Sequence, residues 1–255
     1  MKDKDIEKLR YNNFSLNRIE NTNSEFLNIL GADNFERYLQ DPYLKYQELI
    51  KLEVFSNSKL TQLDLCCGDG MHSFTAAIEG AEVIALDYAE NSIAIARKRS
   101  EIIGVKVNFQ VQDVNILPFL DNSFDIVTCA GSLSYLDHVI FTNEVKRILK
   151  KNGKLIVIDS FNHNIFYRLN RFLHFLKGHR TYSTLKRMPN NKLLNYFKNE
   201  FSELNVRYYG IFIFIVPLLK IFFTHNRIQK IITILDQKFS LLRQYSFKIV
   251  LIAKK

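Results

Sequence analysis

The chain has 255 residues, 47% of them hydrophobic, which suits one α/β domain with appendages and excludes a wholly disordered protein. Three cysteines are too few and too badly spaced for a disulfide framework, which predicts a reducing, cytoplasmic compartment. The net charge of +9 is unevenly spread: residues 160–255 hold 17 of the 35 basic side chains and 3 of the 26 acidic ones. This basic third favours an anionic partner, namely a phosphorylated or nucleotide-linked substrate, nucleic acid, or an anionic membrane surface.

The first 58 residues are polar and read as a helical cap rather than an independent domain. The opening MKDKDIEKLRYNN has no apolar stretch, so we expect no secretory signal. Asp33 is a candidate cap for a helix over 34–39, and Asp41-Pro42 begins a second helix because proline is favoured in a first helical turn.

From residue 60 onward, short apolar runs alternate with segments of helical spacing. Such alternation predicts βαβ units, and therefore a parallel sheet with helices on both faces. The expected strands are 60–66, 82–87, 106–111, 124–130 and 154–159, and the expected helices are 73–79, 91–103 and 139–149, the last followed by a turn over 149–154.

Beyond residue 160 the pattern loosens. Residues 165–176 predict an amphipathic helix with Arg168 and Arg171 on one side. Residues 210–223, GIFIFIVPLLKIFF, are the most apolar run, but 14 residues fall short of the roughly 20 needed to span a bilayer. A buried strand and helix are favoured there over weak peripheral membrane contact. The remaining expected elements are a helix over 192–201, a strand from 206, a helix over 218–235 and a final strand over 245–253.

The stretch LDLCCGDGMHS, residues 63–73, leads an apolar strand into a turn with two glycines. A turn of this kind between a strand and a helix presents backbone N–H groups to the polar end of a cofactor. Asp87 ends the second strand, where a carboxylate can accept hydrogen bonds from both hydroxyls of a ribose. Asp113 ends the third strand, where a carboxylate can receive the amino group of an adenine.

These motifs, together with LDYAENSIAIAR and FQVQDVNILPFLDNSFDIVTC, resemble those of class I S-adenosylmethionine (SAM)-dependent methyltransferases over about residues 60–160. The resemblance implies a Rossmann-like, seven-stranded, mostly parallel sheet with helices on both faces. It divides the chain into a cap (1–58), a SAM-binding core (59–160) and a basic substrate side carrying the final strands (161–255). A nicotinamide-binding domain is the rival, but its usual GxGxxG is missing from this sequence.

The resemblance also assigns cofactor contacts to individual residues. The methionine end of SAM would lie on Asp64 and the turn, the ribose on Asp87, and the adenine against Asp113 and Val114. One departure is Cys66, which stands where the family usually has its first glycine; Cys66 and Cys67 are expected to pack, and no metal is expected. The full expected set is Asp64, Cys66, Gly68, Asp69, Gly70, Asp87, Tyr88, Asp113, Val114 and Ala130.

The acceptor side should lie beyond strands four and five, where Ser132, Tyr135 and Asn162 suit a polyhydroxylated acceptor. A neutral hydroxyl needs a base, and His163 is the first candidate, oriented by Asp159 or else only capping the next helix. His138 is the second candidate. Strand four is followed by neither [DNS]PP[YF] nor Pro-Cys, which argues against nucleic-acid amino methylation and cytosine C5 methylation.

A narrower resemblance follows from AGSLSY and DSFNHNIFYRLNRFLHFLKGHRTYSTLKRMP, which are similar to methyltransferases of surface-polysaccharide (capsule) biosynthesis clusters. It implies O-methylation of a sugar on a nucleotide-activated precursor, with Arg168, Arg171 and Arg180 on the pyrophosphate. The alternatives are a lipid or quinone methyltransferase at the membrane surface, an RNA methyltransferase, and a non-catalytic SAM-binding subunit. Nucleic acid is not the expected partner.

Overall fold

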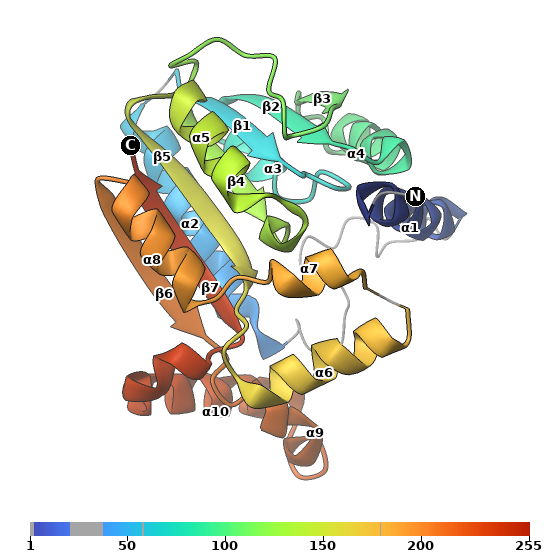
Figure 1. The fold of residues 1–255 in the computed structure, drawn as a ribbon, viewed down its shortest axis with the longest axis vertical. Helices are drawn as coiled ribbons and strands as arrows, with labels where there is room; N and C mark the ends of the chain where they lie inside the picture. The colour runs from blue at the N-terminus through green and yellow to red at the C-terminus, as the bar shows by residue number, and fades with distance from the viewer. Residues whose placement is uncertain (1–2, 21–37, 58, 179) are drawn as a thin grey trace.

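A computed structural model describes residues 3–20, 38–57, 59–178 and 180–255 (Figure 1). The expected helix over 34–39 and its cap Asp33 lie almost entirely outside these residues. The core is a seven-stranded sheet in the order β3-β2-β1-β4-β5-β7-β6, in which β7 is antiparallel to both of its neighbours and the remaining pairs are parallel. The predicted fold is therefore confirmed. The strands are β1 (Thr61–Leu65), β2 (Glu82–Asp87), β3 (Asn108–Val111), β4 (Phe124–Ala130), β5 (Leu149–Ser160), β6 (Glu203–Tyr209) and β7 (Lys248–Lys254).

Helices cover both faces of the sheet because successive strand side chains point to opposite faces. Leu63 and Leu65 of β1 join the core under one helical layer, whereas Asp64 between them points to the other face. Tyr46 and Ile50 belong to the core of that second face. The first layer contains α5 (His138–Ile148) and α8 (Asn191–Glu200), and the second contains α2 (Gln40–Ser56), α3 (Phe74–Ile78) and α4 (Glu90–Ile103).

The expected helix over 218–235 is wrong in its extent, because the chain forms two separate helices there. β6 ends at Tyr209, and both oxygens of Asp236 then accept the amides of Gly210 and Ile211, at 2.5 and 2.8 Å. This clamp turns the apolar run away from the sheet, so no strand continues into it. The run forms η4 (Ile213–Ile215) and α9 (Val216–Leu219), and the longer helix is α10 (His225–Lys238). None of the described helices has the length and apolar character that crossing a membrane requires.

The carboxyl ends of the parallel strands share one edge of the sheet, and polypeptide from both ends of the sequence covers this edge (Figure 1). From the N-terminal side comes α1, which lies against α4. From the C-terminal side comes α7, which lies against η3, while α6 continues outward from the end of β5. These elements are α1 (Asp3–Glu20), η3 (Leu133–Tyr135), α6 (Ile165–Leu176) and α7 (Tyr182–Lys186).

Candidate functional site

The turn after β1 has three residues in the left-handed region, namely Cys66 (φ 55°), Gly68 (φ 56°) and Gly70 (φ 78°). A Cβ at Gly68 would meet nothing within 4 Å, so the backbone is open to a ligand there. A Cβ at Gly70 would lie 2.8 Å from the Phe109 ring. The two glycines therefore serve different purposes: Gly68 leaves space at the edge of the sheet, and Gly70 lets the turn pack on β3.

Asp64 is a buried brace of this turn, with only 1% of its surface exposed. Its two oxygens accept hydrogen bonds from the hydroxyls of Ser73 (2.6 Å) and Thr128 (2.8 Å). Burial raises its pKa to about 6, although the two hydroxyl donors favour the charged form. The structure thus places Asp64 beneath the turn, tying it to α3 and β4.

Asp87 lies at the end of β2 with its carboxylate beside the open glycine. One oxygen accepts the amide of Gly68 and the other the amide of Ala89, both at 2.8 Å. Desolvation raises its pKa, and the backbone amides oppose that shift. Each oxygen retains a further lone pair, which is the capacity that a ribose diol requires.

Asp113 lies beyond β3 and binds the ammonium of Lys4, which reaches across from α1 at 2.8 Å. Desolvation acts to raise the pKa of Asp113, but the hydrogen bonds from Lys4 and Asn115 outweigh it and lower the pKa. Lys4 and Lys8 also lie over the ring of Tyr88, at 5.6 and 4.6 Å. Helix α1 thus extends over two residues expected at the adenosine.

The donor set of this edge fits the nucleoside cofactor that the sequence resemblance implies. Two acidic side chains at neighbouring strand ends and a glycine backbone without obstruction suit a ribose, an adenine amine and a polar tail. The other expected contacts are placed less directly: Asp69 pairs with the buried Arg99 at 3.1 Å, Val114 is 8% exposed within the core, and Ala130 ends β4.

On the acceptor side, Tyr135 of η3 meets the N-terminal helix. Its hydroxyl lies 3.0 Å from both the Arg10 guanidinium and the Tyr11 hydroxyl. Ser132 is buried and donates to the Ala130 carbonyl at 3.1 Å. Both side chains therefore stand beyond β4, as expected, and α1 touches the acceptor side as well as the cofactor side.

The two histidines expected as bases are placed differently from the prediction. His163 packs against Phe161 and Tyr245, with ring centroids 6.4 and 5.6 Å apart. No described contact joins it to Asp159, whose oxygens accept the amides of Leu133 and Ser160. Nor does His163 cap α6: the cap is Asn164, which accepts the Phe166 amide.

His138 is the first residue of α5, and its Nε2 lies 3.0 Å from the Leu133 carbonyl. Burial lowers its pKa, so the ring is neutral near pH 7 and donates Nε2–H to that carbonyl. The neighbouring Asp137 is not oriented toward the imidazole but caps α5, accepting the amides of Val139 and Ile140.

A buried guanidinium stands beside the end of β5. Arg171 of α6 is 5% exposed and donates Nη1–H to the Phe161 carbonyl (3.0 Å) and to Asn162 Oδ1 (2.9 Å). Its Nη2 is buried without a hydrogen-bond partner. Burial, and after it the nearby charge of Arg180, lower the pKa of Arg171 to about 10. Buried polar groups are normally satisfied, so a buried guanidinium nitrogen without a partner, near a second arginine, is a candidate for binding an anionic oxygen.

Several residues near this edge of the sheet are not indicated by any sequence motif. Lys4, Arg10 and Tyr11 come from a segment with no motif, and only the fold brings them to the edge of the sheet. Lys248 begins β7 with 5% exposure and donates to the Tyr43 hydroxyl at 2.5 Å. A lysine directly before five apolar strand residues was the one available signal for it.

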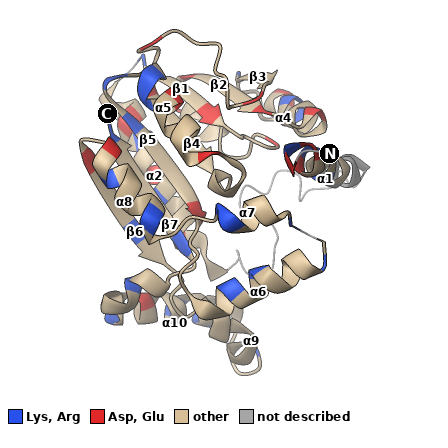
Figure 2. Ribbon diagram, in the orientation of Figure 1, with Lys and Arg blue, Asp and Glu red and all other residues tan. Residues whose placement is uncertain are grey.

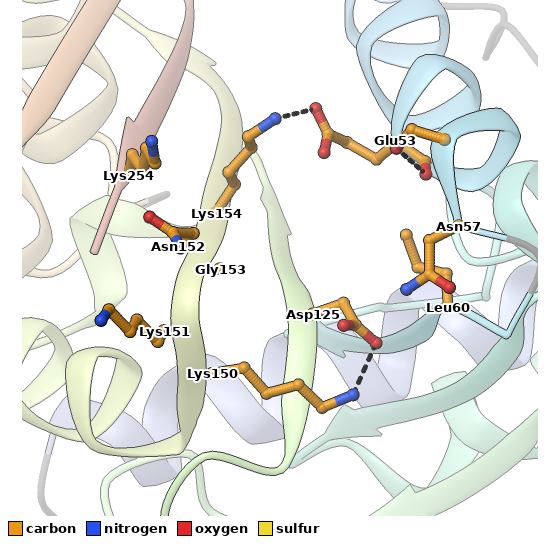
Figure 3. A pocket seen from close by; sticks show the side chains of 11 residues that line it. Glu53, Asn57, Leu60, Asp125, Lys150, Lys151, Asn152, Gly153, Lys154 and Lys254 are labelled. Atoms are coloured by element: carbon orange, nitrogen blue, oxygen red, sulfur yellow. Dashed lines mark hydrogen bonds and ion pairs between the residues drawn. The ribbon is translucent and has the colours of Figure 1, made fainter.

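A hollow at the opposite edge of the sheet is lined partly by lysines (Figure 3). Lys150 pairs with Asp125 and Lys154 with Glu53, at 2.8 and 2.6 Å, so both charges are neutralised by the protein itself. Elsewhere in the described ranges, no group of three or more His, Cys, Asp or Glu side chains clusters as metal ligands would.

Comparison with known proteins identifies the core. A family profile described as a methyltransferase domain matches residues 63–157. A demethylmenaquinone methyltransferase of Thermus thermophilus is 37% identical over 100 residues, which cover 38% of this chain and 46% of that protein. The chain therefore spans about half the length of that curated relative.

Solved structures support the same fold. YcgJ from Bacillus subtilis aligns with a TM-score of 0.55 at 21% identity, covering 83% of this chain and 98% of that one. Phosphoethanolamine N-methyltransferase 2 from Haemonchus contortus, solved with S-adenosyl-L-methionine, aligns at 0.54 and 18%, covering 77% and 49%. This chain has the class I methyltransferase fold, and residues 63–157 match a methyltransferase domain.

Proposed function

We propose that this protein transfers the methyl group of SAM to a small, oxygen-bearing acceptor. The cofactor supplies, when bound, an electrophilic methyl group on a positively charged sulfur. Asp87 would accept the ribose hydroxyls, Asp113 the adenine amine, and the Gly68 backbone would leave room for the polar tail. Displacement needs alignment and exclusion of water more than covalent help from the protein, and α1 and α7 supply walls for such a site.

The acceptor we favour is a quinol-type ring, on the strength of the buried Arg171. A guanidinium next to a hydroxyl favours its ionised form, which is enough for a phenolic hydroxyl with an ordinary pKa of about 10. A sugar hydroxyl is a far weaker acid and needs a base, yet no described contact joins His163 or His138 to a carboxylate. The demethylmenaquinone methyltransferase among the relatives supports the same class of acceptor.

In this proposal Arg171 is a binding residue that holds an acceptor oxygen as an anion. A ring carbon activated by that oxygen then attacks the methyl carbon while the carbon–sulfur bond breaks and S-adenosylhomocysteine leaves. The hydrogen of the attacked ring carbon is lost to solvent as a proton, which restores the aromatic ring. Asn162 keeps the guanidinium in place through its Oδ1, and Arg180 adds positive charge nearby.

The test is methyl transfer from labelled SAM to a demethylated naphthoquinol in detergent, with nucleotide sugars and RNA as competing acceptors. Transfer to the quinol is expected, and Arg171→Lys should lower kcat/KM at least about tenfold through loss of the planar fork. Arg227→Lys, the same change at an exposed position of α10, should leave the rate unaltered. Transfer to nucleotide sugars alone would favour a sugar acceptor over the quinol.

A methylated sugar on a nucleotide-activated precursor is the second candidate. It is favoured by the same pair, Arg171 and Arg180, because two guanidinium groups also suit a pyrophosphate. This second candidate would be supported if the wild type bound a nucleoside diphosphate but no quinol. Arg171→Lys should then abolish the binding of the nucleoside diphosphate.

A further inference from the structure

Helix α6 is amphipathic, but its apolar side is exposed and the side that carries an arginine is buried. Its buried side chains are Tyr167 and Arg171, one turn apart. The apolar side chains fall on the opposite side of the helix, at the i, i+4, i+7, i+11 spacing of a single stripe. They are all exposed, from 46% to 73%, and we call them the α6 face: Ile165, Phe166, Leu169, Phe172, Leu173 and Leu176.

A second apolar group adjoins the N-terminal end of this face. Phe166 stacks on Phe214 of η4, with ring centroids 4.7 Å apart, and η4 leads directly into α9. The residues that follow include Ile221 and Phe222, exposed at 71% and 70%. Soluble proteins rarely leave so many large apolar side chains together in water without a partner.

The charge around the α6 face has one sign. Residues 160–199 contain no Asp or Glu but eight Lys and Arg, and Figure 2 shows blue without red on both α6 and α7. Arg168 on α6, Lys177 directly after α6 and Lys186 on α7 are exposed. An exposed apolar stripe with cationic flanks is complementary to a bilayer that carries anionic headgroups.

The helix is too short to cross a bilayer, so it can only lie in the interface. Its 12 residues extend about 18 Å along the axis, against a hydrocarbon core of about 30 Å. We propose that the α6 face docks the protein on an anionic lipid surface, with the helix parallel to it. This goes beyond the proposed function, since docking needs neither SAM nor an acceptor, and it would hold Arg171, on the other side of the same helix, within about one helix diameter (~10 Å) of the lipid surface.

The experiment is co-sedimentation of the full chain with vesicles of phosphatidylcholine alone or mixed with phosphatidylglycerol in about equal amounts. The double variant Leu169→Gln/Phe172→Gln keeps both charge and helix propensity. It should weaken partition into the mixed vesicles about tenfold or more, because two large apolar side chains no longer enter the lipid. High salt should weaken binding of the wild type.

The matched control is Ile116→Gln/Leu120→Gln, which removes two exposed apolar residues at 75% and 84% from a loop far from α6 in the sequence. This control should bind vesicles like the wild type, and both double variants should keep wild-type thermal unfolding and S-adenosylhomocysteine binding.

Equal vesicle binding by wild type and the α6 variant, or equal binding to neutral and mixed vesicles, would overturn the proposal. So would a dimer in light scattering that the α6 variant converts to a monomer, because the face would then cover a second copy of the chain. A wild type that binds vesicles but methylates nothing would leave docking standing while the proposed function fails.

Discussion

At the scale of single residues, Cys66 carries an unusual backbone conformation for its type. Its φ of 55° lies in the left-handed region, where any side chain costs about 1 kcal/mol and glycine costs nothing. The thiol packs against the core shared with Cys129. A cysteine at the position usually held by glycine therefore has a strained backbone conformation but adds a side-chain contact with the core.

The conformation of Cys66 predicts that, contrary to the usual case, the glycine variant at this position is more stable than the alanine variant. Cys66→Ala and Cys66→Gly both remove the thiol, but only alanine keeps the left-handed strain. Cys66→Gly should therefore be the more stable variant by about 1 kcal/mol in denaturant unfolding. Cys67, which has no positive φ, is the matched control: there the glycine variant should be the less stable one. The same order at both positions would contradict the account.

Asp64 predicts a pH dependence of stability. Its folded pKa of about 6 exceeds the ordinary value of about 3.9, so the folded state binds the extra proton. The contribution of this group is present at low pH and is lost as pH rises through 6, by about 3 kcal/mol in all, of which about 2 kcal/mol is lost between pH 4 and pH 7. Asp64→Asn removes that loss.

The measurement is the free energy of unfolding of wild type and Asp64→Asn between pH 4 and pH 7. The difference between the two should change in favour of the variant as pH rises. A constant difference over this range would mean that the carboxylate titrates normally.

At the scale of elements, α1 differs from the helices that build the core. Its described contacts are mainly polar: Ser15 with Ser92, Lys8 with Glu90, and Glu7 with the hydroxyls of Thr181 and Thr184 on α7, beside the edge-to-face packing of Tyr11 on Tyr135. A single hydrogen bond or ion pair contributes little net stability, so a helix held mainly by such contacts opens more easily than one with a broad apolar face.

We expect amides of α1 to exchange rapidly with deuterium in the free protein and more slowly with S-adenosylhomocysteine bound. The reason is that α1 lies over Asp113 and Tyr88, where the ligand would fill the space beneath it. Helix α2, which buries Tyr46, Ile50 and Val54, is the internal control and should exchange slowly in both states. If the α1 amides exchanged at the same rate with and without the ligand, α1 would not be part of the binding site.

At the scale of the whole molecule, the cofactor site depends on the sheet closing correctly. Asp87, Asp113 and Gly68 follow three different strands and meet because parallel strands end at one edge. A ligand spanning these strand ends should stabilise the entire domain by mass action.

S-adenosylhomocysteine at about a hundred times its Kd should therefore raise the unfolding temperature by roughly 5–10 °C, corresponding to about 2.7 kcal/mol. Asp87→Ala should lose most of this shift and most of the heat of binding in calorimetry, because a ribose diol would have no acceptor. Glu82→Ala, at the exposed start of the same strand, should keep both. If S-adenosylhomocysteine raised the unfolding temperature of Asp87→Ala as much as that of the wild type, Asp87 would not be the residue that binds the ribose.

The fold was predictable because it rests on local periodicity. β2, β4 and α6 begin and end at the predicted residues, since alternating or helical apolar spacing reflects the very faces that become buried. The turn that ends β6 was not predictable, because it depends on Asp236 of α10 reaching back to Gly210 and Ile211. The expected pairing of Asp159 with His163 is absent from the described contacts for a similar reason: Asp159 instead accepts the Leu133 amide, which the loop after β4 brings to it, and the amide of its neighbour Ser160.

The sequence by itself determined the parallel sheet, the glycine turn and the carboxylates at the strand ends, because each is encoded within a few consecutive residues. Only the tertiary structure decided that Asp64 is an internal brace, that α1 covers the edge proposed for the cofactor, and that α6 buries an arginine while its apolar stripe faces outward. A residue's spacing tells which neighbours share its face, but the direction of that face depends on contacts between segments far apart in the chain.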